Sequence, residues 1–411
     1  MIKFAKKLLK TSNLIRISAR QINTSNSSNT TQSQFSEKEG DLGFQPPLED
    51  FEFDGNAFAV NAINFAKQKV KPKEVLQKEN EYQLKLIRER IKFQGDPFEL
   101  VEKDVNAVKD FAINNVIKTE YKQLELPAIY NMSLKGKNFR SAIMCMLARA
   151  IFNNNPQYQN VSSQFEQTKY YTQVKTLSAC IELAHNASLL QGELIQAKRD
   201  MMKKGQVNTD KFDVDDYFGS YVSKTYYKTA SMISLGCRGL GIIFDLDTEA
   251  QRKLFNFGAN LGIAFQVHDD ILDFTQNSEQ LGKPAYNDIK EVKFFQQIFY
   301  QGIITAPLVY TFVEMQQQQS PNVYDFEQRL KRKFQEPGDV QFAIDHLFKS
   351  SGIEMADKLS IDYINESLLN LDSLLVEDTS QGQKHSIISI DKDVYAQALL
   401  GVALKVKTRK Y

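Results

Sequence analysis

The sequence contains no tryptophan and only three cysteines among its 411 residues. Cys145, Cys180 and Cys237 lie far apart and form no CxxC pair. We therefore expect reduced, structural thiols rather than a disulfide framework or a zinc site. Glycine and proline are also few, at 19 and 10 residues. Because both residues disfavour helix interiors, their scarcity suits a helical chain.

Neither a strong net charge nor a long apolar run is present. The net charge of +1 argues against a nucleic-acid binder that relies on bulk electrostatics. No apolar run reaches the roughly 18 residues needed to span a bilayer. Hydrophobic residues make up 42% of the chain, so a sizeable core can form. The length suits one large domain or two ordinary ones.

Acidic residues are absent from residues 1–36. Lysine and arginine are interspersed there with apolar side chains, and Ser, Thr and Asn dominate the second half. A basic, hydroxyl-rich amphipathic leader of this kind is typical of a mitochondrial transit peptide, and a disordered basic tail is the alternative. Residues 37–95 form a mixed connector, in which the highly charged stretch 79–92 predicts a solvated helix. From Asp96 onward, apolar residues recur at helical spacing.

Three carboxylates interrupt a long apolar run within residues 265–274. On a helix, Asp269 and Asp273 share one face and Asp270 flanks it. Like charges this close repel one another, and a divalent cation removes the repulsion. Mg²⁺ typically binds one or two carboxylates together with substrate phosphates. The cluster therefore predicts a Mg²⁺–diphosphate site, and an ordinary solvated acidic face is the alternative.

The residues around this cluster carry a family resemblance. Residues 257–273 read FGANLGIAFQVHDDILD, and residues 282–288 read GKPAYND. This block resembles the second aspartate-rich region of the trans-polyprenyl diphosphate synthase family, FGxxLGxAFQxxDDxLD followed by GKPxxxD. The resemblance implies an all-α isoprenoid-synthase helical bundle around a central cavity. It also implies metal binding by the three aspartates, catalysis by Gln266 and substrate binding by Lys283.

A basic pair precedes another predicted helix. Lys137 and Arg140 lie three residues apart at its first turn, where free backbone amides favour a diphosphate. A solvated basic turn is the alternative. The segment partly resembles the family signature GGKRxRP, although Lys135, Asn138 and Ser141 replace its first Gly, first Arg and Pro. The resemblance implies that Lys137 and Arg140 hold isopentenyl diphosphate.

Two further helical segments match the family. Residues 177–190 resemble the helix in which a histidine, here His185, contacts isopentenyl diphosphate; a core histidine bonded to backbone is the alternative. Small residues follow His185 where the family helix lines the product tunnel, which implies a long product unless they serve helix–helix contacts. Residues 226–232, YYKTASM, resemble YxKTASL. Lys228 and Thr229 would then touch the allylic diphosphate and the developing cation, and an exposed helical lysine is the alternative.

The family pattern breaks after Leu190. The expected HDDxxD is absent, and residues 191–196 resemble a GExxQ segment that lies well downstream in the family. We predict a deletion of several tens of residues at 190/191, which removes the first metal motif and the later RRG; a real short form and an omitted exon remain open. Residues 292–301 read as an insertion, after which Ile303 stands where a phosphate-binding lysine is expected. The synthase-like domain would span residues 96–411.

The function implied by the resemblance is Mg²⁺-dependent, head-to-tail prenyl transfer. Isopentenyl diphosphate would be added to an allylic diphosphate, giving a long polyprenyl diphosphate for a quinone side chain in mitochondria. We expect no nucleic-acid partner, a homodimer or a heteromer with another polyprenyl synthase subunit, and peripheral membrane contact for product release. Because acidic and basic groups are missing, a non-catalytic subunit of a heteromeric synthase is the alternative, and a helical scaffold without a ligand ranks last.

Overall fold

The computed structural model describes residues 53–118, 122–133, 138–158, 164–202, 213–280, 304–378, 383–386, 388, 390 and 392–408. For 122–124, 127, 131, 187–202, 276–280, 375–378 and 383–386 it describes the backbone alone. The chain divides into two units, Met1–Phe53 and Asp54–Tyr411, and the fold that follows is that of the second unit. The predicted leader, 1–36, lies outside the described residues.

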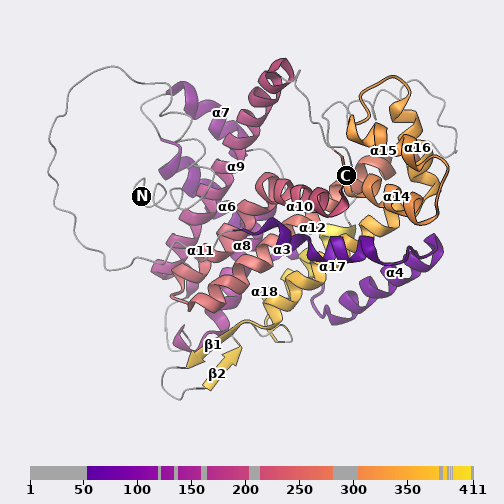
Figure 1. Cartoon of the computed structure of the whole chain (residues 1–411). Helices are drawn as coiled ribbons and strands as arrows, with labels where there is room; N and C mark the ends of the chain where they lie inside the picture. The colour runs from indigo at the N-terminus through magenta and orange to yellow at the C-terminus, as the bar shows by residue number, and fades with distance from the viewer. Residues whose placement is uncertain are drawn as a thin grey trace. The chain divides into compact units, whose positions relative to one another are not determined.

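The described part of the second unit is almost entirely helical (Figure 1). Its first helices are α3 (Gly55–Lys67), α4 (Lys73–Arg90), α5 (Pro97–Leu100), α6 (Glu102–Phe111), the π-helix η1 (Ala112–Val116), α7 (Lys122–Ser133) and α8 (Phe139–Asn154). The middle of the chain forms the 3₁₀ turns η2 (Pro156–Tyr158) and η3 (Phe165–Gln167), then α9 (Lys169–Met202), α10 (Val214–Thr225), the π-helix η4 (Tyr226–Ala230), α11 (Ser231–Ile243) and α12 (Thr248–Gln280). The last helices are α14 (Ala306–Gln317), α15 (Val323–Lys331), α16 (Asp339–Lys349), α17 (Gly352–Asp372) and α18 (Val394–Thr408). The predicted all-α class is confirmed.

One small β-hairpin was not predicted. Strands β1 (Leu375–Asp378) and β2 (Gln383–Ser386) pair antiparallel, with Leu375 opposite Ser386 and Asp378 opposite Gln383. Four-residue strands are too short for their side-chain alternation to stand out from a helical pattern.

Helix α12 lies at the centre of the packing, between α11 and α17 (Figure 1). Buried serines of α17 hydrogen-bond to carbonyls of α12: Ser367 Oγ donates to the Phe257 oxygen at 3.0 Å, and Ser360 Oγ donates to the Ala264 oxygen at 3.2 Å. Small residues thus let the two helices approach while their polar atoms stay paired. Helix α12 is therefore a rigid support for the carboxylates near its C-terminal half.

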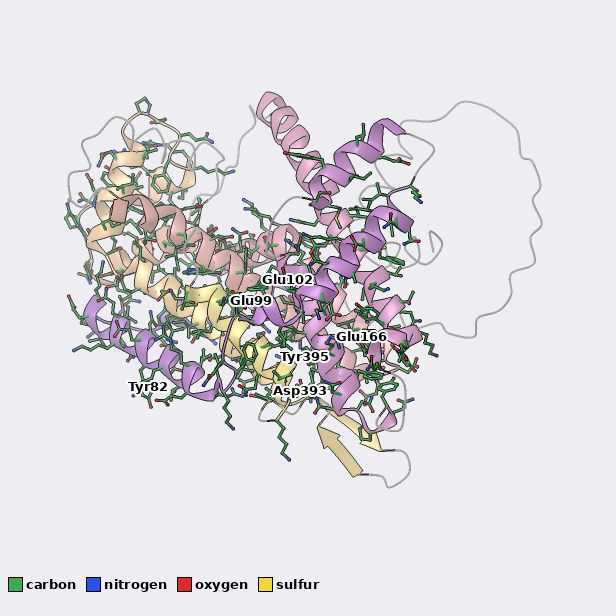
Figure 2. The ribbon with its side chains drawn as sticks, turned by 180° about the vertical axis from the view of Figure 1, so that it is seen from behind. Tyr82, Glu99, Glu102, Glu166, Asp393 and Tyr395 are labelled. Carbon is green, nitrogen blue, oxygen red and sulfur yellow. The ribbon has the colours of Figure 1, made fainter. Side chains whose placement is uncertain are left out.

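The sequence predicted a solvated helix over residues 79–92, but the helix found there, α4, has one buried face. Leu76 and Ile87 are buried, and buried Asn80 donates a side-chain hydrogen bond to the Glu354 oxygen of α17 at 3.1 Å. Tyr82 lies on the outer face of α4 (Figure 2) and is 57% exposed. The partner helix follows more than 250 positions later, so local composition could not reveal the buried face.

A largely buried ion pair joins α6 and α8. The Arg149 guanidinium of α8 donates to both oxygens of Asp104 on α6, at 2.7 and 2.8 Å, and to Glu166 at 2.5 Å. The Tyr395 ring of α18 lies 5.4 Å from the same guanidinium, and Figure 2 shows Glu166 and Tyr395 near each other on this side.

A hydrophobic cluster joins α14, α15 and α16 around Phe312. None of the helices that the structure describes combines the length and apolar character needed to cross a bilayer.

Candidate active site

The predicted helix around the three aspartates is part of α12. Asp270 is 6% exposed and points into the protein, Asp269 is partly buried, and Asp273 is exposed. The helix therefore separates one inward carboxylate from two that face outward.

Asp270 is fixed by two donors. Tyr221 of α10 donates its hydroxyl to Oδ2 at 2.7 Å, and Gln266 donates its side-chain amide to Oδ1 at 3.0 Å. Burial raises the pKa of Asp270 to about 6, while these two hydrogen bonds and the nearby charge of Lys228 act in the opposite direction. Both carboxylate oxygens thus accept hydrogen bonds from the protein.

The segment with Lys228 and Thr229 forms the π-helix η4. π-turns insert an extra residue into a helix and occur frequently at functional sites. Thr229 donates its hydroxyl to Gln266 Oε1 at 2.8 Å. Because the Gln266 amide also donates to Asp270, its orientation is set by both neighbours. Three predicted residues therefore form one hydrogen-bonded chain, Thr229–Gln266–Asp270.

The outward carboxylates affect each other electrostatically. Although the Asp273 side chain reaches the surface, its carboxylate is partly desolvated, which raises its pKa; the negative charge of Asp269 raises this pKa further, and the exposed Lys228 lowers it. This is the repulsion that a divalent cation would relieve. Among the described residues, no three His, Cys, Asp or Glu side chains gather closely enough to hold a metal ion. Since Mg²⁺ commonly takes only one or two carboxylates beside phosphates, the pair Asp269 and Asp273 fits it, whereas Asp270 is already engaged.

A second set of predicted residues lies where α8 meets α9. Helix α8 begins at Phe139, after Asn138 in a left-handed conformation with φ of 42°. Burial lowers the pKa of Arg140, and Glu182 raises it. Burial also lowers the pKa of His185 to about 4, with a further contribution from the charge of Arg140. The structure thus brings Arg140 and His185 together, and His185 is neutral at pH 7.

Arg140 has an unused donor. Its Nε is buried and, within the part of the chain that the structure describes, has no hydrogen-bond acceptor. An unpaired buried donor on a cation is costly, and an anion would satisfy it. The environment of Arg140 therefore fits a phosphate group.

An aromatic contact connects the two parts of the site. The rings of Phe139 and Phe265 lie 5.0 Å apart, centroid to centroid. Each ring belongs to the residue directly before a predicted site residue, Arg140 on α8 and Gln266 on α12. The first turn of α8, which carries Arg140, therefore packs against α12 close to Gln266.

Several predictions fall outside the described residues: Lys137, Lys283, the insertion 292–301 and Ile303. The backbone of α9 runs as one helix through 190/191, the predicted deletion point.

The sequence analysis did not predict two residues of the site, Tyr221 and Glu182. Each had a signal, because Tyr221 lies seven residues before Lys228 and Glu182 three residues before His185, which are spacings that share a helix face.

Comparisons with known proteins show what the chain is similar to. The profile of the polyprenyl synthetase family matches residues 190–347. A mitochondrial solanesyl-diphosphate synthase 1 of rice is 26% identical over 371 residues, which cover 77% of this chain and 79% of that protein. A chloroplastic solanesyl diphosphate synthase 2 of Arabidopsis thaliana is 36% identical over 163 residues, 40% of this chain and 35% of that protein.

Among solved structures, a polyprenyl synthase from Caulobacter crescentus, complexed with calcium and isoprenyl diphosphate, covers 77% of this chain and 97% of its own. Its TM-score is 0.51 at 17% sequence identity, a likeness in fold. The fold is therefore that of the all-α isoprenoid synthases. The family profile and the curated relatives make the chain similar to the polyprenyl synthetase family, the profile over residues 190–347.

Proposed function

We propose that this chain is a Mg²⁺-dependent trans-prenyltransferase, which adds isopentenyl diphosphate head-to-tail to an allylic diphosphate. The observation that carries the proposal is the hydrogen-bonded chain Thr229–Gln266–Asp270, which ties the YYKTAS turn to the acidic cluster. Relatives named as solanesyl diphosphate synthases support a long polyprenyl product, of the kind used for quinone side chains.

The residues around the cluster suit a bound cation. Asp269 and Asp273 would hold Mg²⁺ on their shared face, with Asp270 beside them. When bound, the cation neutralises charge on the departing diphosphate. Lys228 adds a positive charge from η4, close enough to lower the pKa of Asp270 and Asp273.

The reaction breaks the C1–O bond of the allylic diphosphate, and the electron pair leaves with the diphosphate. C4 of isopentenyl diphosphate then bonds to the allylic C1, and C2 loses a proton to an oxygen of the departed diphosphate. Thr229 donates its hydrogen to Gln266, so its oxygen lone pairs remain to stabilise the allylic cation. Arg140 would bind the diphosphate of isopentenyl diphosphate through its unused buried Nε, and neutral His185 would donate a second hydrogen bond.

The test is turnover by the purified chain with radiolabelled isopentenyl diphosphate, farnesyl or geranylgeranyl diphosphate, and Mg²⁺. Elongated, Mg²⁺-dependent product is the expected result. Absence of product from the folded chain alone, at all allylic lengths tried, would overturn independent catalysis.

We further propose that several tens of residues are missing at 190/191. The rice alignment is 371 positions long although it covers only 77% of the 411 residues, so several tens of its positions face gaps in this chain. The loss of HDDxxD keeps the non-catalytic subunit as the second candidate function. Product from a mixture with a full-length homologue, lost when the homologue's own aspartates are mutated, would identify such a subunit. A transcript with an extra exon between Leu190 and Gln191 would instead restore the full enzyme.

Mitochondrial targeting is the last part of the proposal. It rests on the acid-free segment 1–36 and on relatives named as mitochondrial, although other relatives are named as chloroplastic. A reporter fused to residues 1–36 should enter mitochondria, and a diffuse cytosolic signal would contradict this.

A further inference from the structure

Glu182 of α9 is a buried carboxylate at the junction with α8. It is 8% exposed. Its Oε1 accepts two hydrogen bonds from one residue of α8, from the Ser141 backbone N–H at 3.1 Å and from the Ser141 hydroxyl at 3.0 Å. A single oxygen of Glu182 thus fastens α9 to the first turn of α8.

This contact replaces a missing helix cap. The first backbone N–H groups of a helix lack partners inside the helix, and the N-cap side chain usually accepts from the second or third of them. Asn138 occupies the N-cap position of α8, but its side chain makes no capping hydrogen bond. Glu182 performs this role from another helix, by accepting from the third residue of α8, Ser141.

The same carboxylate lies between the two residues assigned to isopentenyl diphosphate. Arg140 directly precedes Ser141, and the charge of Glu182 opposes the lowering of the Arg140 pKa by burial. His185 follows Glu182 by three residues, on the same face of α9. The charge of Arg140 in turn lowers the pKa of His185, so the three side chains interact in one place.

We propose that Glu182 is a positioning residue for isopentenyl diphosphate. It holds the first turn of α8 against α9, so that Arg140 and His185 can bind the same diphosphate. It touches no reacting atom itself. This inference rests on the proposed function, since it names what holds that site in shape.

The test measures binding of isopentenyl diphosphate alone to the full chain by titration calorimetry, because this substrate is not consumed without an allylic partner. Glu182→Ala removes both hydrogen bonds and should weaken binding at least about tenfold, the effect of losing about one hydrogen bond's free energy. Glu182→Gln keeps one oxygen able to accept from both Ser141 donors. It should therefore restore binding to within about threefold of the wild type.

Glu314 of α14 offers a matched control. It is also 8% exposed, and its Oε2 accepts the N–H of Ser351 at 2.6 Å. Ser351 is the N-cap residue of α17, and its side chain makes no capping hydrogen bond. Glu314→Ala should lower thermal stability as Glu182→Ala does, yet leave isopentenyl diphosphate binding unchanged. Binding of farnesyl thiodiphosphate with Mg²⁺ should be unaffected by either substitution.

The outcomes separate the two proposals. A wild-type chain that does not bind isopentenyl diphosphate would refute the proposed function. If the wild type binds, equal affinity in Glu182→Ala would overturn the positioning role. So would equal weakening by Glu182→Gln, or by Glu314→Ala, because the effect would then come from charge or from general instability.

Discussion

Gly262 of α12 lies directly against the backbone of Ala230 in η4. A Cβ atom added at Gly262 would stand 2.5 Å from the Ala230 Cα and 2.6 Å from its Cβ. One turn earlier, a Cβ at Gly258 would stand 2.7 Å from the Ser234 Cα. The two glycines therefore set how close α12 comes to η4 and α11, and one turn beyond Gly262 this approach brings Gln266 to Thr229.

Gly262→Ala should separate these helices. Overpacking of a close backbone contact costs about 1–3 kcal/mol. The displacement should also break the Thr229–Gln266 hydrogen bond. The kcat of the folded enzyme should therefore fall even at temperatures where the variant remains folded. Denaturant unfolding and steady-state kinetics measure both effects.

Gly401→Ala is the control for this substitution. It is also a helix glycine, but its added Cβ would meet Pro97 at an ordinary 3.4 Å. It should leave kcat near the wild-type value and raise stability by up to about 1 kcal/mol, because alanine suits a helix interior better than glycine. A fully active Gly262→Ala enzyme would show that the close approach does not position Gln266.

Local spacing predicted a helix around the three aspartates, but it could not predict which residues of other helices would hydrogen-bond to the side chains of the site. Asp270 is held by Tyr221, 49 positions earlier in the chain. Ser141 is capped by Glu182, 41 positions later. Periodicity reports which residues share a face of one helix, whereas these contacts depend on which face of another helix packs against it. The buried face of α4 and the hairpin after α17 were missed for related reasons.

Thr229→Val should impair catalysis in two ways, because it removes the oxygen proposed to stabilise the allylic cation and leaves the Gln266 amide oxygen without its donor. Valine has nearly the same shape but cannot donate to Gln266 Oε1, which is then left buried without its present donor. The loss of such a hydrogen bond is worth about 1.4 kcal/mol, and we expect at least a tenfold fall in kcat/KM. Thr311→Val is the control, because Thr311 is fully buried and hydrogen-bonded in α14 away from the site. Equal losses in both variants would mean that the effect is structural.

Tyr221→Phe should affect Asp270 without disturbing the fold. It removes only the hydroxyl that donates to Oδ2 at 2.7 Å, and a charge-assisted hydrogen bond contributes about 1.5–3 kcal/mol. We expect lower kcat/KM with unchanged helical content. Tyr363→Phe is the matched control, since that buried hydroxyl donates to the Phe58 oxygen at 2.8 Å on α3. Retained activity in Tyr221→Phe would show that Asp270 needs no support from α10.

The low pKa of His185 predicts a pH-dependent stability. The pKa falls from the usual 6.5 to about 4 on folding. Between these values the unfolded chain binds more protons than the folded one, so the free energy of unfolding decreases as pH falls from 6.5 toward 4. Thermal melts at intervals across that window should show the decrease, and His185→Gln should flatten it. An unaltered pH slope in the variant would mean that His185 is not buried as described.

Asp269→Asn should abolish Mg²⁺-dependent ligand binding without lowering the stability of the free protein. The charge of Asp269 raises the pKa of Asp273, so the pair repels in the absence of a cation. Removing one charge should leave the free protein unchanged or slightly more stable, by a few tenths of a kcal/mol. The same change should abolish the Mg²⁺-dependent binding of an allylic thiodiphosphate, measured by calorimetry with and without EDTA. Asp362→Asn is the control, because this α17 carboxylate is also partly buried, and it should leave that binding intact. If Asp269→Asn binds the analogue and Mg²⁺ as the wild type does, then the outward face of α12 is an ordinary solvated acidic surface and not the metal site.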